Sequence, residues 1–361
     1  MAGFLATVSL SSASNVVQKW TPFTDEVFST LVSVIFITKA VGSLAEAVLG
    51  APTLLPGLVT LSLALTTYGV TKVFKKARNS SFGTRAVRAA ISNFAPTLGV
   101  AAACVLALWV KGRHGVVLAA LKLPQQQFGT TIGRSWLVPL FDLPIWARWA
   151  AALPAAMATV VLFFEHAITH RLINAPRFQM KKGRSRAVSL TDGMHADAGV
   201  LALLTVVQSL LGLPWLTAAT VRSLAHVQAL QTYDPHTGKP NGVVEQRVTN
   251  AVIHTVLGAL VVANAPRQWL TRTVPPAGLM GLFFYMGSST LTSGNALWAR
   301  LVGLIARQKD KTTSPERAPR HLVKRLCAVQ FTCVATLFWL SQHKTLGVLF
   351  PLVLALLPPL R

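Results

Sequence analysis

One short segment of the sequence combines a helix breaker, small hydroxylated residues and an arginine. It reads GLPWLTAATVRSLAH over residues 212–226, and Pro214 ends the apolar run that precedes it. Four small residues come next: Thr217, Ala218, Ala219 and Thr220. We expect them to open a short helix over 216–231, with Arg222 in its first turn or two.

The chemistry that this pattern predicts is anion binding. A helix that begins in an apolar environment leaves its first N–H groups without backbone partners. Those groups and the positive end of the helix dipole favour an anion, which small side chains allow to approach the backbone. Arg222 adds a permanent charge and forked donors suited to a planar oxyanion. The alternative is that Arg222 extends to a membrane interface and Pro214 only caps a hairpin.

Glu165 is an acidic residue within an apolar run. It follows AAALPAAMATVVLFF (150–164) and precedes HAITH. An ionisable group in a membrane span is costly and needs a partner or a water-filled cavity. One interpretation is a carboxylate that couples transport to ions or protons. The other is an interfacial residue paired with Arg171 or His170.

The remaining reactive residue types indicate neither a metal site nor catalysis. His195 and Asp197 are two positions apart, too few ligands for a metal, and we expect them to cap a helix and order a loop. The three cysteines lie in apolar runs and form no CxxC, so we interpret them as packing residues: Cys104, Cys327 and Cys333. The sequence contains no nucleophile elbow, Walker loop, Rossmann glycine pattern or HExxH motif. We therefore expect a protein that is not an enzyme and uses no cofactor.

The composition indicates which elements must position these residues. Of 361 residues, 52% are hydrophobic and only 12% charged, whereas soluble domains carry about 25% charged residues. Apolar stretches recur at about the length of a membrane span. We predict spans near 23–49, 52–71, 90–110, 144–168, 196–214, 248–264, 275–291, 326–341 and 345–360. The predicted fold class is an all-α polytopic membrane protein.

The basic residues are gathered in loops of this predicted membrane domain. There are 34 Lys and Arg against 11 Asp and Glu, and the formal net charge is +23. Basic clusters lie at 72–88, 171–186 and 300–325, and counting spans places all of them on one side, which the positive-inside rule makes cytoplasmic. The long connection at 111–143 is then outside. Because membrane topology accounts for the charge, we expect the lipid bilayer and no nucleic acid as partner.

Several stretches resemble the bicarbonate transporter family, to which the band 3 anion exchanger belongs, and they occur in the family's order. The stretch 212–226 resembles the family's second half-helix. The others are PFTDEVFSTLVSVIFI (22–37), KKARNSSF (75–82), LFFEHAIT (162–169), GMHAD (193–197), VVEQRVT (243–249) and GLFFYMGSSTL (281–291). The resemblance runs from about residue 15 to the C-terminus.

The resemblance implies a fold of fourteen segments in two inverted repeats, with a core domain that moves against a gate domain. Mapped onto this chain, it makes 1–21 the remnant of a fourth span and 111–143 an extracellular loop. It assigns 22–110 and 265–361 to the gate domain and 144–264, with the half-helix at 216–231, to the core. The first three segments are expected to be missing. The gate domain is expected to form a homodimer.

The resemblance also implies a function. Glu165 falls at the family's acidic position in the eighth span, and Arg222 at its arginine in the tenth segment. Sodium-coupled members typically have Asp and an apolar residue there. We therefore expect sodium-independent exchange of bicarbonate for chloride, in the plasma membrane, at a site made of Glu165, Arg222 and Thr217 to Thr220. The alternatives are borate transport, sodium-coupled bicarbonate transport, or a truncated non-transporting subunit that dimerises with a full-length relative.

Overall fold

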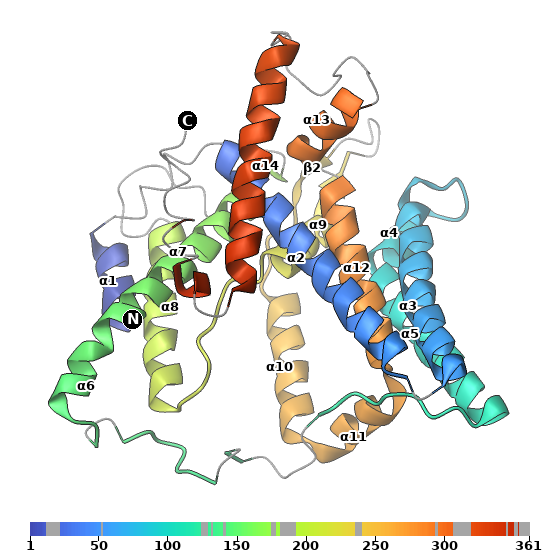
Figure 1. Ribbon diagram of the computed structural model, residues 1–361, viewed down its shortest axis with the longest axis horizontal. Helices are drawn as coiled ribbons and strands as arrows, with labels where there is room; N and C mark the ends of the chain where they lie inside the picture. Colours follow the sequence, from blue (N-terminus) through green and yellow to red (C-terminus); the bar gives the residue numbers. More distant parts are fainter. Residues whose placement is uncertain are drawn as a thin grey trace. The chain divides into compact units, whose positions relative to one another are not determined.

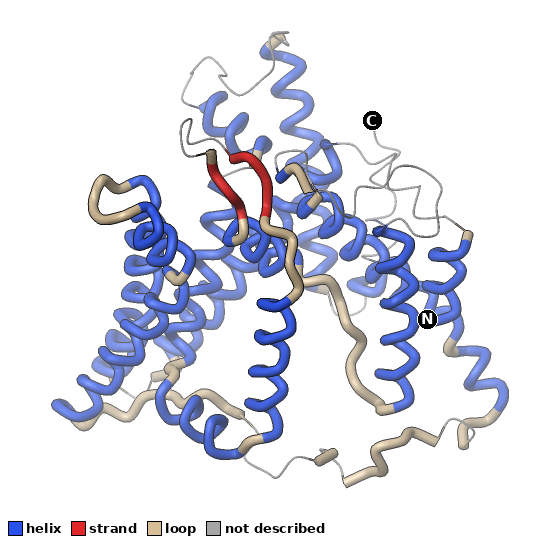
Figure 2. Tube along the Cα trace, turned by 180° about the vertical axis from the view of Figure 1, so that it is seen from behind, coloured by secondary structure: helices blue, strands red, loops and turns tan. Residues whose placement is uncertain are grey.

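The computed structural model describes residues 1–361 except 12–21, 52, 124–128, 131–132, 140–141, 175–177, 181–192, 235–239, 293–294, 306–318, 344–345, 350–352 and 354–361. In this part of the chain the regular secondary structure is helical, apart from one antiparallel hairpin (Figures 1 and 2). The predicted all-α membrane fold class is confirmed.

Six helical stretches are long and apolar enough to cross a membrane. They are α2 (Pro22–Leu49), α3 (Leu54–Lys75) with the 3-10 turn η2 (Lys76–Asn79), α5 (Ala95–His114), α6 (Ile145–Ala150) with α7 (Ala152–Ile173), α8 (Gly193–Leu210) and α14 (Arg320–Gln342). Each corresponds to a predicted span. Two further predicted spans coincide with α10 (Val248–Val262) and α12 (Pro276–Thr292).

The shorter elements show where the sequence was harder to interpret. They are α1 (Ala2–Leu10), α4 (Arg85–Asn93), α9 (Thr220–Ala229), α11 (Asn264–Thr273), α13 (Ala296–Ile305) and η4 (Leu346–Leu349). The helix expected over 216–231 begins only at Thr220. The predicted span at 90–110 is divided into α4 and α5 at Phe94. Most of the span predicted at 345–360 lies outside the described residues.

The connection between α9 and α10 carries the β-hairpin. Strand β1 (Gln231–Tyr233) pairs antiparallel with β2 (Pro240–Val243), with Gln231 opposite Val243 and Thr232 opposite Gly242. Helices α10 and α11 meet at a 91° bend, which is the geometry of a broken span or a re-entrant loop.

The chain divides into two compact units, and neither is continuous in sequence. Unit 1 contains residues 1–25, 129–250 and 339–361, and unit 2 contains 26–128 and 251–338. In unit 1, α7 and α8 pack with the short helix α1, and α9 packs on α7. The apolar core there is Leu5, Leu162, Leu201 and Ala202.

Unit 2 is built around three closely packed helices, α3, α5 and α12. Its core contains Leu63, Ala103, Ala107 and Ala277. Small residues allow the helix backbones to approach, as is usual in membranes, where lipid offers no hydrophobic drive for helix association. Gly99 faces Thr67 and Thr71 of α3, and Gly281 faces the backbone of Ala64.

We predict that Gly281→Ala destabilises this packing. A Cβ atom there would lie 2.1 Å from the Ala64 carbonyl oxygen, so the two helices must separate. Overpacking of this kind costs roughly 1–3 kcal/mol, and the melting temperature of the detergent-purified protein should fall. Gly258→Ala is the control, because a Cβ there meets nothing within 4 Å and alanine favours a helix by up to about 1 kcal/mol. Equal melting temperatures for the two variants would contradict this packing.

Candidate functional site

The candidate site begins where the chain leaves the helical state between α8 and α9. Residues 213–219 are without regular secondary structure, and α9 starts at Thr220. The first backbone hydrogen bond of the new helix runs from the Ser223 N–H to the Ala219 carbonyl, at 2.9 Å. In the described part of the chain, the N–H groups of Thr220, Val221 and Arg222 have no partner. These are the free donors that an anion site requires.

Helix α7 holds the start of α9 by side-chain hydrogen bonds. The hydroxyl oxygens of Thr169 and Thr220 are 2.6 Å apart. One turn earlier on α7, the Glu165 carboxylate has the Thr217 side chain as a hydrogen-bond partner. Two contacts one helical turn apart therefore fix both the unwound residues and the first residue of α9 against α7.

Glu165 is half-buried, and one of its carboxylate oxygens has an unusual environment. Its Oε2 atom is shielded from solvent and lacks a hydrogen-bond partner in the described part of the chain. The pairing with His170 or Arg171, considered from the sequence, does not occur there. The Nδ1 atom of His170 lies 3.6 Å from Asp197 instead, and Arg171 pairs with Asp25 at 3.2 Å. Glu165 thus keeps an acceptor that no cation of the described chain neutralises.

Arg222 occupies the third position of α9 and is exposed. Where the chain is described, its guanidinium group makes neither an ion pair nor a hydrogen bond. The expected proximity to Glu165 therefore involves no ion pair. Of the other predicted site residues, Thr217 is exposed, and Ala218, Ala219 and Thr220 are half-buried. The arrangement brings all of them to the beginning of one helix.

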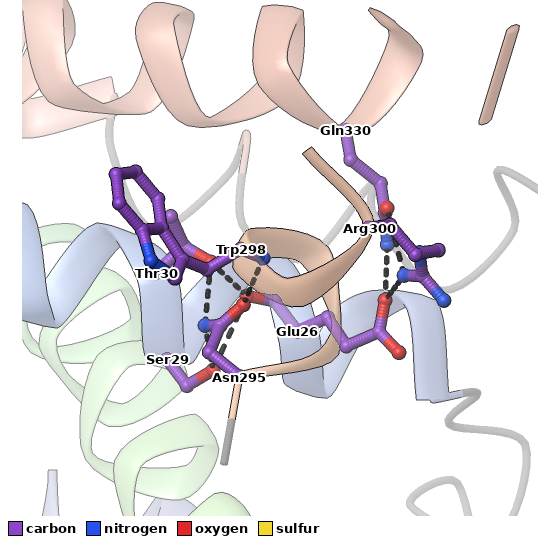
Figure 3. Close-up of polar contacts among 7 residues, drawn as sticks. All are labelled: Glu26, Ser29, Thr30, Asn295, Trp298, Arg300 and Gln330. Atoms are coloured by element: carbon purple, nitrogen blue, oxygen red, sulfur yellow. Dashed lines mark hydrogen bonds and ion pairs between the residues drawn. The ribbon is translucent and has the colours of Figure 1, made fainter. Parts of the chain in front are cut away.

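A second polar cluster, in unit 2, was not anticipated from the sequence. Figure 3 shows Arg300 of α13 and Gln330 of α14 directed at the Glu26 carboxylate of α2. Gln330 donates to Glu26 Oε2 at 2.7 Å and accepts from Arg300 at 3.2 Å, and Arg300 also pairs with Glu26. Gln330 is 0% exposed.

Asn295 completes this cluster by joining α2 to the start of α13. Its amide donates to the hydroxyls of Ser29 and Thr30, at 3.0 and 2.7 Å, and its carbonyl accepts the Trp298 N–H (Figure 3). The last contact is the helix N-cap that asparagine commonly provides. Because the Glu26 charge is paired within the cluster, we interpret the cluster as a structural tie rather than a second ion site.

The histidines near α7 and α8 form no metal centre in the described chain. There, no group of three His, Cys, Asp or Glu residues is suitably placed for a metal ion. His195 is 1% exposed, and its carbonyl accepts the Ser9 hydroxyl at 2.8 Å. It therefore lies in the interior of unit 1, near the start of α8, and its expected role in capping that helix stays a prediction.

Comparison with known proteins identifies relatives of this chain. Residues 53–361 match the family described as HCO3- transporter integral membrane domain. Anion exchange protein 4 of Homo sapiens is 30% identical over 302 residues, which is 82% of this chain and 29% of that protein. Electrogenic sodium bicarbonate cotransporter 1 of Sus scrofa is 32% identical over 313 residues, which is 84% of this chain and 27% of that protein. Sodium bicarbonate cotransporter 3 of Homo sapiens is 31% identical over 304 residues, which is 81% of this chain and 24% of that protein. The match thus spans less than a third of the length of these relatives.

Proposed function

Because the chain belongs to the family of the HCO3- transporter integral membrane domain, we propose that it is a secondary transporter that carries bicarbonate by alternating access. It is an integral multi-pass α-helical membrane protein, and its named relatives are transporters, not enzymes. No covalent chemistry is needed, so the protein has to bind the anion and then expose it to the other side.

The observation that carries this proposal is the start of α9. Among the described residues, three N–H groups without partners and an unpaired arginine lie at one helix end, after an unwound segment. Broken helices are a common way for secondary transporters to build substrate sites. We place the anion against the backbone of Thr217 to Thr220, with Arg222 supplying a permanent positive charge.

We further propose that bicarbonate is exchanged for chloride without sodium. Arg222 gives the site a fixed positive charge, so an anion can be bound without a sodium ion beside it. The relatives include an anion exchange protein and sodium bicarbonate cotransporters, so the proposed mode of coupling rests on the charge of Arg222 and on the family resemblance at Glu165 and Arg222.

A rocking mechanism is part of this proposal. The core is residues 144–264, which contain α9 and Glu165 and carry the anion, and the gate domain is 22–110 and 265–361. The compact units divide the chain differently, because unit 2 includes 251–264 and unit 1 includes 339–361. Homodimerisation through the gate domain and location in the plasma membrane belong to the same proposal, and the family resemblance alone supports them.

The mode of transport is tested with the purified chain in proteoliposomes. An outward chloride gradient should drive bicarbonate uptake, whereas an inward sodium gradient without chloride should not, because Arg222 replaces the coupling cation. The measurement is uptake of labelled bicarbonate, with gluconate in place of chloride as the control. Uptake that requires sodium would contradict exchange, and uptake of borate in place of bicarbonate would contradict the substrate.

Glu165→Gln should change how transport depends on pH. The glutamine resembles the protonated carboxyl, so it removes the negative charge that opposes a second charge on the anion. We expect transport of a divalent anion such as sulfate to lose most of its stimulation by acid and to become fast at neutral pH. Glu46→Gln is the matched control, because Glu46 is exposed on α2 and its side chain makes neither a hydrogen bond nor an ion pair in the described chain. The same pH profile for Glu165→Gln and wild type would refute this role.

A further inference from the structure

Helix α8 ends in a hydrogen-bond pattern that satisfies two of its carbonyls internally. The Leu213 N–H bonds to the Gln208 carbonyl at 2.8 Å, and the Gly212 N–H bonds to that of Ser209 at 3.2 Å. Gly212 has φ of 60°, the left-handed conformation that glycine adopts at little cost. This is the Schellman arrangement, in which the chain turns sharply away from the helix axis. It still leaves the last carbonyls of α8 without internal partners.

A segment more than 70 residues earlier supplies the missing partners. The Val138 N–H donates to the Leu210 carbonyl at 2.8 Å. The Arg134 guanidinium donates through Nη2 to the carbonyls of Leu211 and Gly212, at 2.9 and 3.1 Å. Three successive carbonyls at the negative end of the α8 dipole are thus paired, two of them with a cation.

Arg134 is itself held in place by its own loop. The Thr130 hydroxyl donates to the Arg134 carbonyl at 2.6 Å, and Gly133 has φ of 70°. A second guanidinium nitrogen, Nη1, donates to the Ser135 carbonyl at 2.9 Å. The guanidinium lies against Gly212, where a Cβ atom would be 2.4 Å from Nη2. Gly212 therefore supplies both the turn and the space for Arg134.

The unwound segment after α8 is consequently held at several points along its length. Arg134 and Val138 fix its start at Leu210 to Gly212, the Gln208 side chain accepts the Leu216 N–H at 3.1 Å, and α7 holds Thr217 and Thr220. The Arg134 contacts are the charged ones among these backbone contacts, and charge-assisted hydrogen bonds are the stronger kind.

We propose that Arg134 is a positioning residue for the anion site at the start of α9. It touches no substrate. It fixes the point at which the chain leaves α8 and so keeps residues 213–219 in the conformation that presents the free N–H groups. This inference rests on the proposed function, because it concerns the same site.

The proposal predicts a specific kinetic effect for Arg134→Ala. Without the guanidinium, a smaller fraction of the protein is in the binding-competent conformation. The apparent affinity for bicarbonate falls in proportion to that fraction. We expect the KM for bicarbonate to rise about tenfold, while the maximal rate stays within about twofold because Arg222 and Glu165 are intact. Arg134→Lys, which keeps a cationic donor, should recover part of the loss. Arg113→Ala, an exposed arginine without interactions in the described chain, should match wild type.

Hydrogen exchange measured on the same variants separates this idea from the proposed function. Backbone amides of 213–219 should exchange faster in Arg134→Ala than in wild type or Arg113→Ala, with no change in α3 or α12. An unchanged KM, or a lower maximal rate at unchanged KM with a reduced melting temperature, would overturn the positioning role. If wild type takes up no bicarbonate, the proposed function fails. The exchange data then decide alone: faster exchange confined to 213–219 supports the role, and unchanged exchange overturns it.

Discussion

A polar backbone group inside a bilayer must find its hydrogen bond within the protein, because no water replaces it. Helices meet this requirement along most of the described chain. The exception that concerns function is the interruption between α8 and α9. There the acceptors at the end of α8 are paired with Arg134 and Val138, whereas the donors at the start of α9 have no partner among the residues that the structure describes. At this helix break, within the described chain, the carbonyl acceptors are hydrogen-bonded and the N–H donors are not. Such a break can bind a ligand that accepts hydrogen bonds, as an anion does.

The two acidic residues Glu26 and Glu165 show the difference between a carboxylate that stabilises the structure and one that can contribute to a binding site. Glu26 is paired with Arg300 and Gln330, and this pairing joins α2, α13 and α14 within unit 2. Removing one partner of such a largely shielded pair is costly, so the cluster stabilises one arrangement. Glu165 has a threonine partner for its carboxylate but an oxygen that is shielded from solvent and has no partner in the described part of the chain. An uncompensated carboxylate close to free N–H donors can respond to what binds there, and a neutralised one cannot.

The sequence was sufficient to predict the long spans, because a run of about 20 apolar residues is typical of a helix that crosses a membrane. It also located the segment that contains the proposed site, since proline, small residues and an arginine mark a helix break. It did not predict the helix start at Thr220, because the preceding residues are held unwound by partners outside the segment, namely the Gln208 side chain and α7. Helices α11 and α13 were missed because they have only 10 residues each and α11 is rich in polar residues. The contacts of Arg134 and of Glu26 join residues 77 to 304 positions apart, and no local pattern encodes such pairs.

The central claim is that the start of α9, with Arg222, binds the transported anion. The most direct measurement is bicarbonate uptake by proteoliposomes with an outward chloride gradient, comparing wild type, Arg222→Ala and Arg247→Ala. Arg247 is the matched control, since it is exposed in the same unit and unpaired in the described chain. The account predicts that uptake persists in Arg247→Ala and collapses in Arg222→Ala at unchanged thermal stability. Wild-type uptake by Arg222→Ala would contradict it.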